Sequence, residues 1–406
     1  MSTDDIHDSA YSWLRLCITM VIAMVANVGI WAIILVLPSV ETEFGATRAE
    51  ASLAYTMTMI GFALGNLLIG RIVDRFGVTL ALIAAALTSA VAYLLVMAAP
   101  TMGLLSTAHL LLGLGTAAGF GPLMADISHW FLRRRGIAVA LVASGNYISG
   151  GIWPSLLTPM LAGGDWRQVY LLLAGVTVAT VIPLALLLRR RLPEEAHGRA
   201  QAASDLKALS AGFSPRALQW LLGLAGIGCC IAMSMPQVHI VAYCIGLGYG
   251  PAVGADLLSL MLLGGAVSRI VFGLVADRLG GVRTVLVGAL LQALALALYL
   301  PWDAMVPLYI ISLVFGLSQG GIVPSYALIV REYMPAREAG ARVGFVLMMT
   351  ILGMAIGGWM SGWIFDLSGS YHLAFLNGVL WNGLTIAIML LLLARSRPRA
   401  PRGVAA

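Results

Sequence analysis

The stretch Gly70-Arg-Ile-Val-Asp74-Arg75-Phe-Gly77 occurs twice in this 406-residue chain, the second time as Gly273-Leu-Val-Ala-Asp277-Arg278-Leu-Gly280. The two copies start 203 residues apart (273 − 70), which is half the length of the chain. At the same separation Gly61 matches Gly264, and Gly113 matches Gly316. Such a repeat predicts two duplicated halves, an architecture that recurs in secondary transporters, where the substrate site lies near the midplane between the repeats.

The composition places these halves in a membrane. Sixty per cent of the residues are apolar and only 10% are charged, against roughly a quarter charged in soluble domains. The apolar residues form runs of about 20, the length that a membrane-spanning helix needs. We therefore expect an all-α membrane protein with twelve transmembrane helices in two pseudo-symmetric six-helix bundles. The expected spans are 12–37, 50–70, 79–99, 103–127, 137–160, 167–188, 216–246, 253–275, 283–300, 305–330, 341–365 and 371–394.

The longest polar stretch divides these spans six and six. The predicted domains are an N-terminal bundle (1–188), a cytoplasmic linker (189–215), a C-terminal bundle (216–394) and a cytoplasmic tail (395–406). The first apolar run is too long for a signal peptide and is interpreted as a retained span. The four cysteines fall inside predicted spans without ligand spacing, which favours small apolar packing over disulfides or a metal site.

The basic residues predict the orientation. With both termini in the cytoplasm, every Lys and Arg except Arg48, Arg167 and Arg269 falls on the cytoplasmic side, Arg15 included. This asymmetry in short loops is what the positive-inside rule describes. The net charge of +6 therefore indicates membrane orientation rather than nucleic-acid binding, and we expect an integral plasma membrane protein, specifically of a bacterial inner membrane.

Arg269 is the most informative residue. It lies in the eighth predicted span, eight residues before Asp277, which at 1.5 Å per residue is roughly 12 Å inside the cytoplasmic end. Intramembrane arginines are costly and usually face a water-filled cavity or a substrate path. The equivalent position of the first half holds Asn66 (269 − 203), and no Asp or Glu lies in the core of any span. An unpaired guanidinium favours an anionic ligand, and its fork suits a carboxylate. The alternative is a structural arginine bonded to helix-end carbonyls or to a half-buried acid.

The duplicated motif at matched positions resembles the loop motif of the major facilitator superfamily. The resemblance covers nearly the whole chain and includes Asp165-Trp166-Arg167 at the start of the sixth span. It implies a cytoplasmic charge relay that locks the outward-open state. The residues that match this relay are Gly70, Asp74, Arg75, Gly273, Asp277 and Arg278. The alternative is a plain tight turn with helix-end charges.

The eighth span and the segment 129–136 resemble the monocarboxylate porters and the oxalate:formate antiporters, in which an arginine at this place holds the substrate carboxylate. The chain departs from both groups. Residues 341–365 contain no Lys, so a dicarboxylate that needs two cations is less favoured than a monocarboxylate. Gly265 and Ser39 stand where animal monocarboxylate porters have an acid and a lysine, so their proton-coupling scheme does not carry over. In the fourth span Phe120 stands where these relatives often have a tyrosine, which suggests a more apolar pocket wall.

Other polar residues are weaker candidates. Pro236 and Gly246 are expected to interrupt the seventh span, where a broken helix could serve as an outer gate. Three side chains between them are candidates for that gate or for proton coupling: Gln237, His239 and Tyr243. Further candidates for the substrate site are Asn27, Asn146, Tyr147 and Tyr326. Each could instead make ordinary interhelical hydrogen bonds, and methionines such as Met354 are expected only to pack.

These features predict a secondary active transporter of a small organic anion, with a monocarboxylate favoured, working by alternating access with proton symport or anion exchange. A multidrug or cation efflux carrier, a dicarboxylate exchanger and a sugar carrier of the same fold remain alternatives. No enzyme motif stands out, and no cofactor or metal is expected. The expected partners are the small carboxylate, protons in the symport case and the lipid bilayer, with no nucleic acid and a monomeric state.

Overall fold

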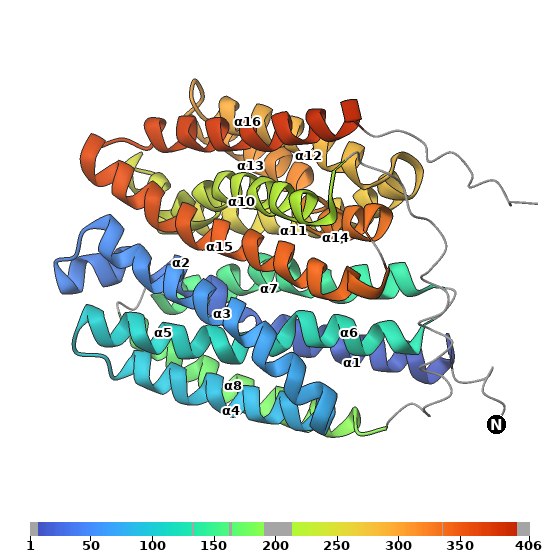
Figure 1. The fold of residues 1–406 in the computed structure, drawn as a ribbon. Helices are drawn as coiled ribbons and strands as arrows, with labels where there is room; N and C mark the ends of the chain where they lie inside the picture. Colours follow the sequence, from blue (N-terminus) through green and yellow to red (C-terminus); the bar gives the residue numbers. More distant parts are fainter. Residues whose placement is uncertain (1–6, 132–133, 162–164, 191–212, 335, 396–406) are drawn as a thin grey trace, which may run out of the picture.

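The computed structural model describes residues 7–131, 134–161, 165–190, 213–334 and 336–395, and every regular element in these ranges is a helix (Figure 1). The first half contains α1 (Ala10–Ala26), α2 (Val28–Phe44), α3 (Arg48–Phe76), α4 (Val78–Met97), α5 (Met102–Thr116), the 3-10 turn η2 (Ala117–Gly119), α6 (Gly121–Trp130), α7 (Arg135–Leu161) and α8 (Trp166–Leu187). The second half contains α10 (Pro215–Gly246), α11 (Gly250–Leu279), α12 (Gly281–Leu298), α13 (Met305–Gln319), α14 (Ile322–Tyr333), α15 (Ala336–Ser368) and α16 (His372–Arg395).

These helices make twelve crossings. Eleven segments of the described chain are long and apolar enough to span a membrane, counting α1–α2, α5–α6 and α13–α14 as one each. The twelfth is α7, which has 27 residues, Asn146, Tyr147 and two prolines among them, and is not one of the eleven. The predicted twelve-helix membrane fold is confirmed.

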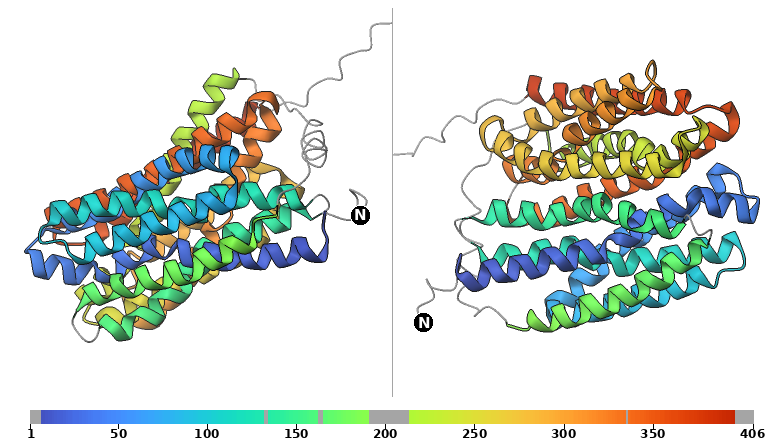
Figure 2. Two further views of the ribbon diagram at one scale, coloured as in Figure 1. Left: turned by 90° about the horizontal axis from the view of Figure 1, so that it is seen from below. Right: turned by 180° about the vertical axis from the view of Figure 1, so that it is seen from behind.

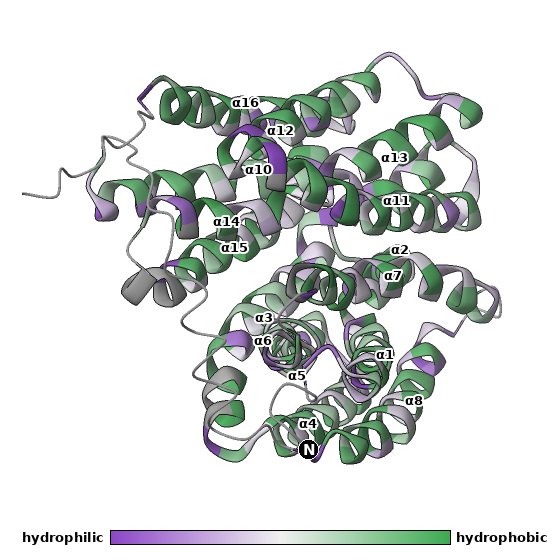
Figure 3. Ribbon diagram, turned by 90° about the vertical axis from the view of Figure 1, so that its right-hand side faces the viewer, coloured by the Kyte–Doolittle hydropathy of each residue, from purple (hydrophilic) through white to green (hydrophobic). Residues whose placement is uncertain are grey.

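The helices are grouped in two bundles, with α1–α8 in one and α10–α16 in the other. The bundles lie one above the other when the molecule is viewed along its helices (Figure 3). We call the end with the N-terminus of α1 and the turns at Gly77 and Gly280 the basic end, and the opposite end the distal end (Figures 1 and 2). The bundles meet mainly along α3 against α15 and α7 against α11. Most of the linker predicted at 189–215, together with the tail 396–406, lies outside the described residues.

The matched glycines explain why the two bundles have the same internal packing. A side chain at Gly61 would collide with the Leu110 carbonyl, and the equivalent Gly264 lies against Leu313. Gly113 in turn lies against Thr58, and the equivalent Gly316 lies against Met261. Every member of the second set is 203 residues after its counterpart. The repeat therefore preserves the contact between α3 and α5 as the contact between α11 and α13.

The predicted interruption of the seventh span is wrong. Helix α10 runs without a break from Pro215 to Gly246, with Pro236 inside it, because a transmembrane helix tolerates a proline where its neighbours can satisfy the freed backbone group. The breaks lie elsewhere. Asn27 separates α1 from α2, Phe120 separates η2 from α6, and a Gly-Gly pair at 320–321 separates α13 from α14.

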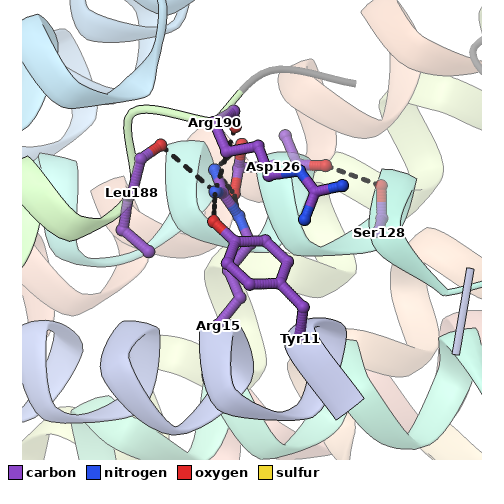
Figure 4. Close-up of polar contacts among 7 residues, drawn as sticks. Tyr11, Arg15, Asp126, Ser128, Leu188 and Arg190 are labelled. Carbon is purple, nitrogen blue, oxygen red and sulfur yellow. Dashed lines mark hydrogen bonds and ion pairs between the residues drawn. The ribbon is translucent and has the colours of Figure 1, made fainter. Parts of the chain in front are cut away.

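Arg15, which the positive-inside analysis counted on the cytoplasmic side, lies near the start of α1 and is buried. Its side chain is only 1% exposed and is paired with Asp126 of α6 at 2.9 Å. Its NH1 group donates to the carbonyls of Leu188 and Arg190, at 3.1 and 3.3 Å, and to the Tyr11 hydroxyl at 3.4 Å (Figure 4). Arg15 thus joins α1, α6 and the end of α8, a structural role in which the buried charge is neutralised.

Candidate functional site

A cavity lies between the two bundles and includes Arg269 in its wall. It encloses about 640 Å³, its open mouth included. Seven of the lining residues carry polar atoms: Trp31, Tyr55, Asn146, Tyr147, Gln237, Arg269 and Thr350. The others are apolar or carry sulfur: Ile30, Met59, Phe62, Phe120, Cys230, Met233, Val323, Leu347, Ile351 and Met354. Such a wall, mostly apolar with a few polar groups, is typical of small-molecule sites.

Arg269 of α11 is held at the junction of the two bundles. Its Nε donates to the Gly320 carbonyl at 3.2 Å, beside the break between α13 and α14, and its NH1 donates to the Ala143 carbonyl of α7. The guanidinium lies over the Tyr147 ring, 4.1 Å from its centroid, a cation–π arrangement. Among the described residues, no carboxylate forms an ion pair with Arg269.

These contacts combine both interpretations of Arg269. Backbone carbonyls do satisfy part of the guanidinium, as the structural alternative proposed. The side chain nonetheless lines the cavity, with 5% of its surface exposed. A guanidinium has five N–H donors, and only two are accounted for by the carbonyls of Gly320 and Ala143. Donors and a full positive charge therefore remain for a ligand.

Polar side chains near Arg269 are tied to one another across helices. The indole nitrogen of Trp31 donates to the carbonyl and the amide oxygen of Asn146, at 3.0 and 3.1 Å. The Tyr147 hydroxyl donates to the sulfur of Met233 at 3.7 Å. Gln237 donates to the side chain of Gln319 at 3.0 Å. The predicted site residues Phe120, Asn146, Tyr147, Gln237 and Arg269 are thus brought together around one cavity.

Two predicted site residues lie elsewhere. Asn27 is fully buried at the break between α1 and α2, where its amide donates to the carbonyls of Ala23 and Gly119, at 2.7 and 2.9 Å. It therefore stabilises two helix breaks instead of lining the cavity. Tyr326 is buried in a second apolar cluster of the C-terminal bundle, which also contains Cys229, and is not part of the cavity wall.

His239 and Tyr243 also lie outside the cavity wall. The two ring nitrogens of His239 are engaged by the Gly358 carbonyl at 2.8 Å and the Tyr371 hydroxyl at 3.2 Å. The Tyr243 ring packs edge-on against Tyr371 and Phe375. Within the described residues, the cavity wall contains no His, Asp or Glu. A role for His239 in proton coupling stays a prediction, but it would have to act from the distal side of the cavity.

Sequence reasoning missed several wall residues. Tyr55, Met59 and Phe62 of α3 follow one another at helical spacing, and Leu347, Ile351 and Met354 of α15 do the same from the other bundle. Met354, expected only to pack, is part of the wall. The periodicity of these faces was present in the sequence. It could not indicate a cavity, because apolar faces toward lipid, a neighbouring helix or a cavity have the same pattern.

The distal side of the cavity is closed by contacts between the bundles. The backbone N–H groups of Arg48 and Ala49, at the start of α3, donate to the Asp366 carboxylate of α15 at 3.0 and 2.7 Å. Nearer the cavity, the Thr56 hydroxyl donates to the Ala355 carbonyl at 2.9 Å. The hydrogen bonds described between the bundles all lie level with the cavity or on its distal side.

Comparison with known proteins decides the family. The model of the Major Facilitator Superfamily matches residues 19–255 and 245–406. This chain belongs to the Major Facilitator Superfamily. Among its curated relatives, bovine Monocarboxylate transporter 13 is 28% identical over 75% of this chain and 68% of the relative. Human Monocarboxylate transporter 11 is 32% identical over 66% of this chain and 60% of the relative. The Aspergillus niger MFS-type transporter pynF is 25% identical over 80% of this chain and 75% of the relative.

The facilitator loop motif adopts the same turn in both halves. Gly77 and Gly280 have φ values of 89° and 78°, a left-handed region that favours glycine. The exposed side chains of Arg75 and Arg278 lie just before these turns, whereas the side chains of Asp74 and Asp277 lie outside the described part. Gly70 and Gly273 lie in α3 and α11, each seven residues, or about two helical turns, before the turn. The charge relay of these residues stays a prediction.

Proposed function

We propose that this chain is a secondary transporter of a small monocarboxylate and that Arg269 binds the carboxylate. The observation that supports this most strongly is a guanidinium in the wall of a central cavity, without an acidic partner among the described residues. A bidentate guanidinium–carboxylate pair is stronger than a neutral hydrogen bond and fixes the orientation of the ligand. Two mammalian relatives are named monocarboxylate transporters, which agrees with this substrate class.

The alternatives fit the cavity less well. A cation needs a buried acid, and the described wall has none, which disfavours cation efflux. A dicarboxylate would bring a second negative charge, whereas Arg269 is the one charged residue in the described wall. A neutral sugar would leave the guanidinium uncompensated.

We further propose that the two bundles rock around the cavity in alternating access, with both termini in the cytoplasm. The distal closure through Asp366 and α3 supports a conformation in which the cavity is reached from the basic end. The excess of basic residues in the loops of that end supports a cytoplasmic orientation. Proton symport and anion exchange both balance the substrate charge, and a pH-gradient experiment in proteoliposomes distinguishes them.

A thermal-shift screen of the purified protein tests the substrate class. Bound ligand stabilises the folded state by about 2.7 kcal/mol at a hundredfold excess over the dissociation constant. Monocarboxylates should stabilise the parent and the Arg216→Gln variant, which removes an exposed arginine, but not Arg269→Gln. Stabilisation by organic cations, or an unchanged response of Arg269→Gln, would contradict the proposal.

A further inference from the structure

The cavity wall is broad and mostly apolar. It is formed by seventeen residues of seven helices and of the break before α6, and ten of these residues are apolar or carry sulfur. A three-carbon hydroxy acid has only six non-hydrogen atoms, so one bound at Arg269 would leave most of this wall facing water. Burying the apolar wall against a ligand is favourable. The extent of the apolar wall therefore indicates a ligand with a body well beyond three carbons.

The walls away from Arg269 suit an aromatic or branched body. Phe62 of α3 and Phe120, at the break before α6, pack with their ring centroids 5.9 Å apart. Across the cavity, Ile351 and Met354 of α15 contribute aliphatic and thioether surface. Aromatic pairs favour edge-on and offset ring contacts, and methionine adapts its shape to irregular partners.

A second polar group in the wall is without a partner. The Tyr55 side chain lines the cavity and is fully buried, and its hydroxyl makes no hydrogen bond to any described residue. Tyr55 shares the cavity wall with Cys230 and Tyr147. Buried hydroxyls are normally hydrogen-bonded, and each exception calls for an explanation. A bound ligand with a hydrogen-bond acceptor would supply the missing partner.

Tyr55 is fixed in place by the distal closure. Its ring packs against Gly358 of α15, where an added Cβ would meet the ring at 2.8 Å. The phenol therefore cannot swing freely to find another partner while the distal side is closed. A donor held in one position discriminates among ligands better than a mobile one, because little rotamer freedom is lost when it binds.

We infer that the transported anion is an amphipathic monocarboxylate whose carboxylate binds Arg269 and whose bulky aromatic or branched body fills the space between Phe62, Phe120 and Met354. A separate acceptor group on this anion accepts a hydrogen bond from the Tyr55 hydroxyl. This inference rests on the proposed function and adds the size and second polar group of the substrate. Arg269 then determines that an acid binds, and Tyr55 determines which acid.

Calorimetric titration of the purified full-length protein tests the inference with five probes: lactate, phenylacetate, 4-hydroxyphenylacetate, phenyllactate and the neutral phenylacetamide. The aryl acids should bind at least about tenfold more tightly than lactate, and phenylacetamide should not bind measurably. At least one of the two hydroxylated aryl acids should bind about five- to tenfold more tightly than phenylacetate, the gain expected from one neutral hydrogen bond.

The Tyr55→Phe variant keeps the ring and its packing and removes only the hydroxyl. It should abolish the preference for the hydroxylated acid while leaving the affinity for phenylacetate unchanged. Tyr93→Phe is the matched control, because Tyr93 is equally buried but lies outside the cavity wall, and it should keep the preference. Unchanged unfolding temperatures of both variants without ligand exclude a folding defect.

The outcomes separate the inference from the proposed function. If lactate binds as tightly as the aryl acids, or if the hydroxyl preference is absent or survives Tyr55→Phe, the inference is overturned while the carboxylate carrier stands. If no acid binds to the folded protein, the carboxylate assignment itself is wrong. Loss of all binding in Arg269→Gln, with the hydroxyl preference lost only in Tyr55→Phe, supports both.

Discussion

Asn66 and Arg269 occupy the same position in the two halves of the molecule, and their surroundings show how a duplicated fold becomes asymmetric. Asn66 donates to the Phe62 carbonyl at 2.8 Å and accepts from the Gly121 N–H at 3.2 Å, so its amide is used within its own bundle. Arg269 also bonds backbone at a helix break, at Gly320, but then reaches the Ala143 carbonyl and the Tyr147 ring of the other bundle. One side chain thus stabilises a bundle, and the other lies where the bundles meet a cavity.

The two halves share the placement of this residue beside a helix break, but they differ in the chemical group that stands there. In both halves the side chain approaches the backbone beside the break of a neighbouring helix, a place where free polar groups need partners. An amide can satisfy such a place completely. A guanidinium brings more donors and a permanent charge, which the carbonyls alone do not neutralise. The following changes are aimed at this contrast.

The largest effect is expected from Arg269→Asn, which gives both halves the same residue. Loss of a buried charged partner of a carboxylate costs about 2–5 kcal/mol of binding, or roughly 30-fold to several thousandfold in affinity. Carboxylate uptake into proteoliposomes and calorimetric binding should therefore fall below detection. The folded protein should keep about the stability of the parent, because removal of a desolvated charge offsets the loss of the donors to the Gly320 and Ala143 carbonyls. Saturable uptake that persisted with parental affinity would show that Arg269 is only structural.

The next effect is expected from Asn66→Ala and concerns stability instead of binding. The substitution leaves the half-buried Gly121 N–H without its acceptor, and loss of such a hydrogen bond costs about 0.5–1.5 kcal/mol. The unfolding temperature measured by tryptophan fluorescence should drop, while the ligand affinity of the remaining folded protein should stay at the parental value. A variant with normal stability and weakened binding would reverse the roles assigned to the two positions.

A smaller effect is expected from Tyr147→Leu, which removes the ring under the guanidinium. A desolvated cation–π contact contributes about 2 kcal/mol, and part of it is replaced by the leucine packing. Affinity for monocarboxylates should therefore change by about tenfold or less, without loss of the selectivity for acids over amides. Tyr147→Phe, which keeps the ring, is the matched control and should bind as the parent does. Equal defects in both variants would assign the effect to the Tyr147 hydroxyl, which donates to the Met233 sulfur.

The sequence was sufficient for the fold and for one central residue of the site. The twelve spans follow from apolar runs, and the matched glycines Gly61 and Gly264 already indicated that the halves pack alike. Arg269 could be found because an unpaired charge in a span is rare. Tyr55 could not, because a tyrosine in an apolar helix is ordinary and its lack of a partner is visible only in three dimensions. The break assigned to Pro236 failed because proline lowers helix stability without forcing a break when neighbouring helices pack around it.

The smallest effect is expected at the basic end, where Glu332 of α14 accepts from the Gly281 N–H at 3.0 Å and so caps α12. The equivalent position of the first half is His129 (332 − 203).

Burial raises the pKa of the Glu332 carboxyl above its ordinary value, and the hydrogen bond from Gly281 opposes this only in part. Between the ordinary and the raised pKa the folded protein therefore holds more protons than the unfolded chain, so the free energy of unfolding decreases as the pH rises through this window. Glu332→Gln removes this titration. As the pH is lowered from about 7 to about 5, the unfolding temperature of the parent should therefore rise relative to that of the variant. A pH-independent difference would mean that the cap is fully ionised in the fold and that its carboxylate is stabilised by the helix N-terminus.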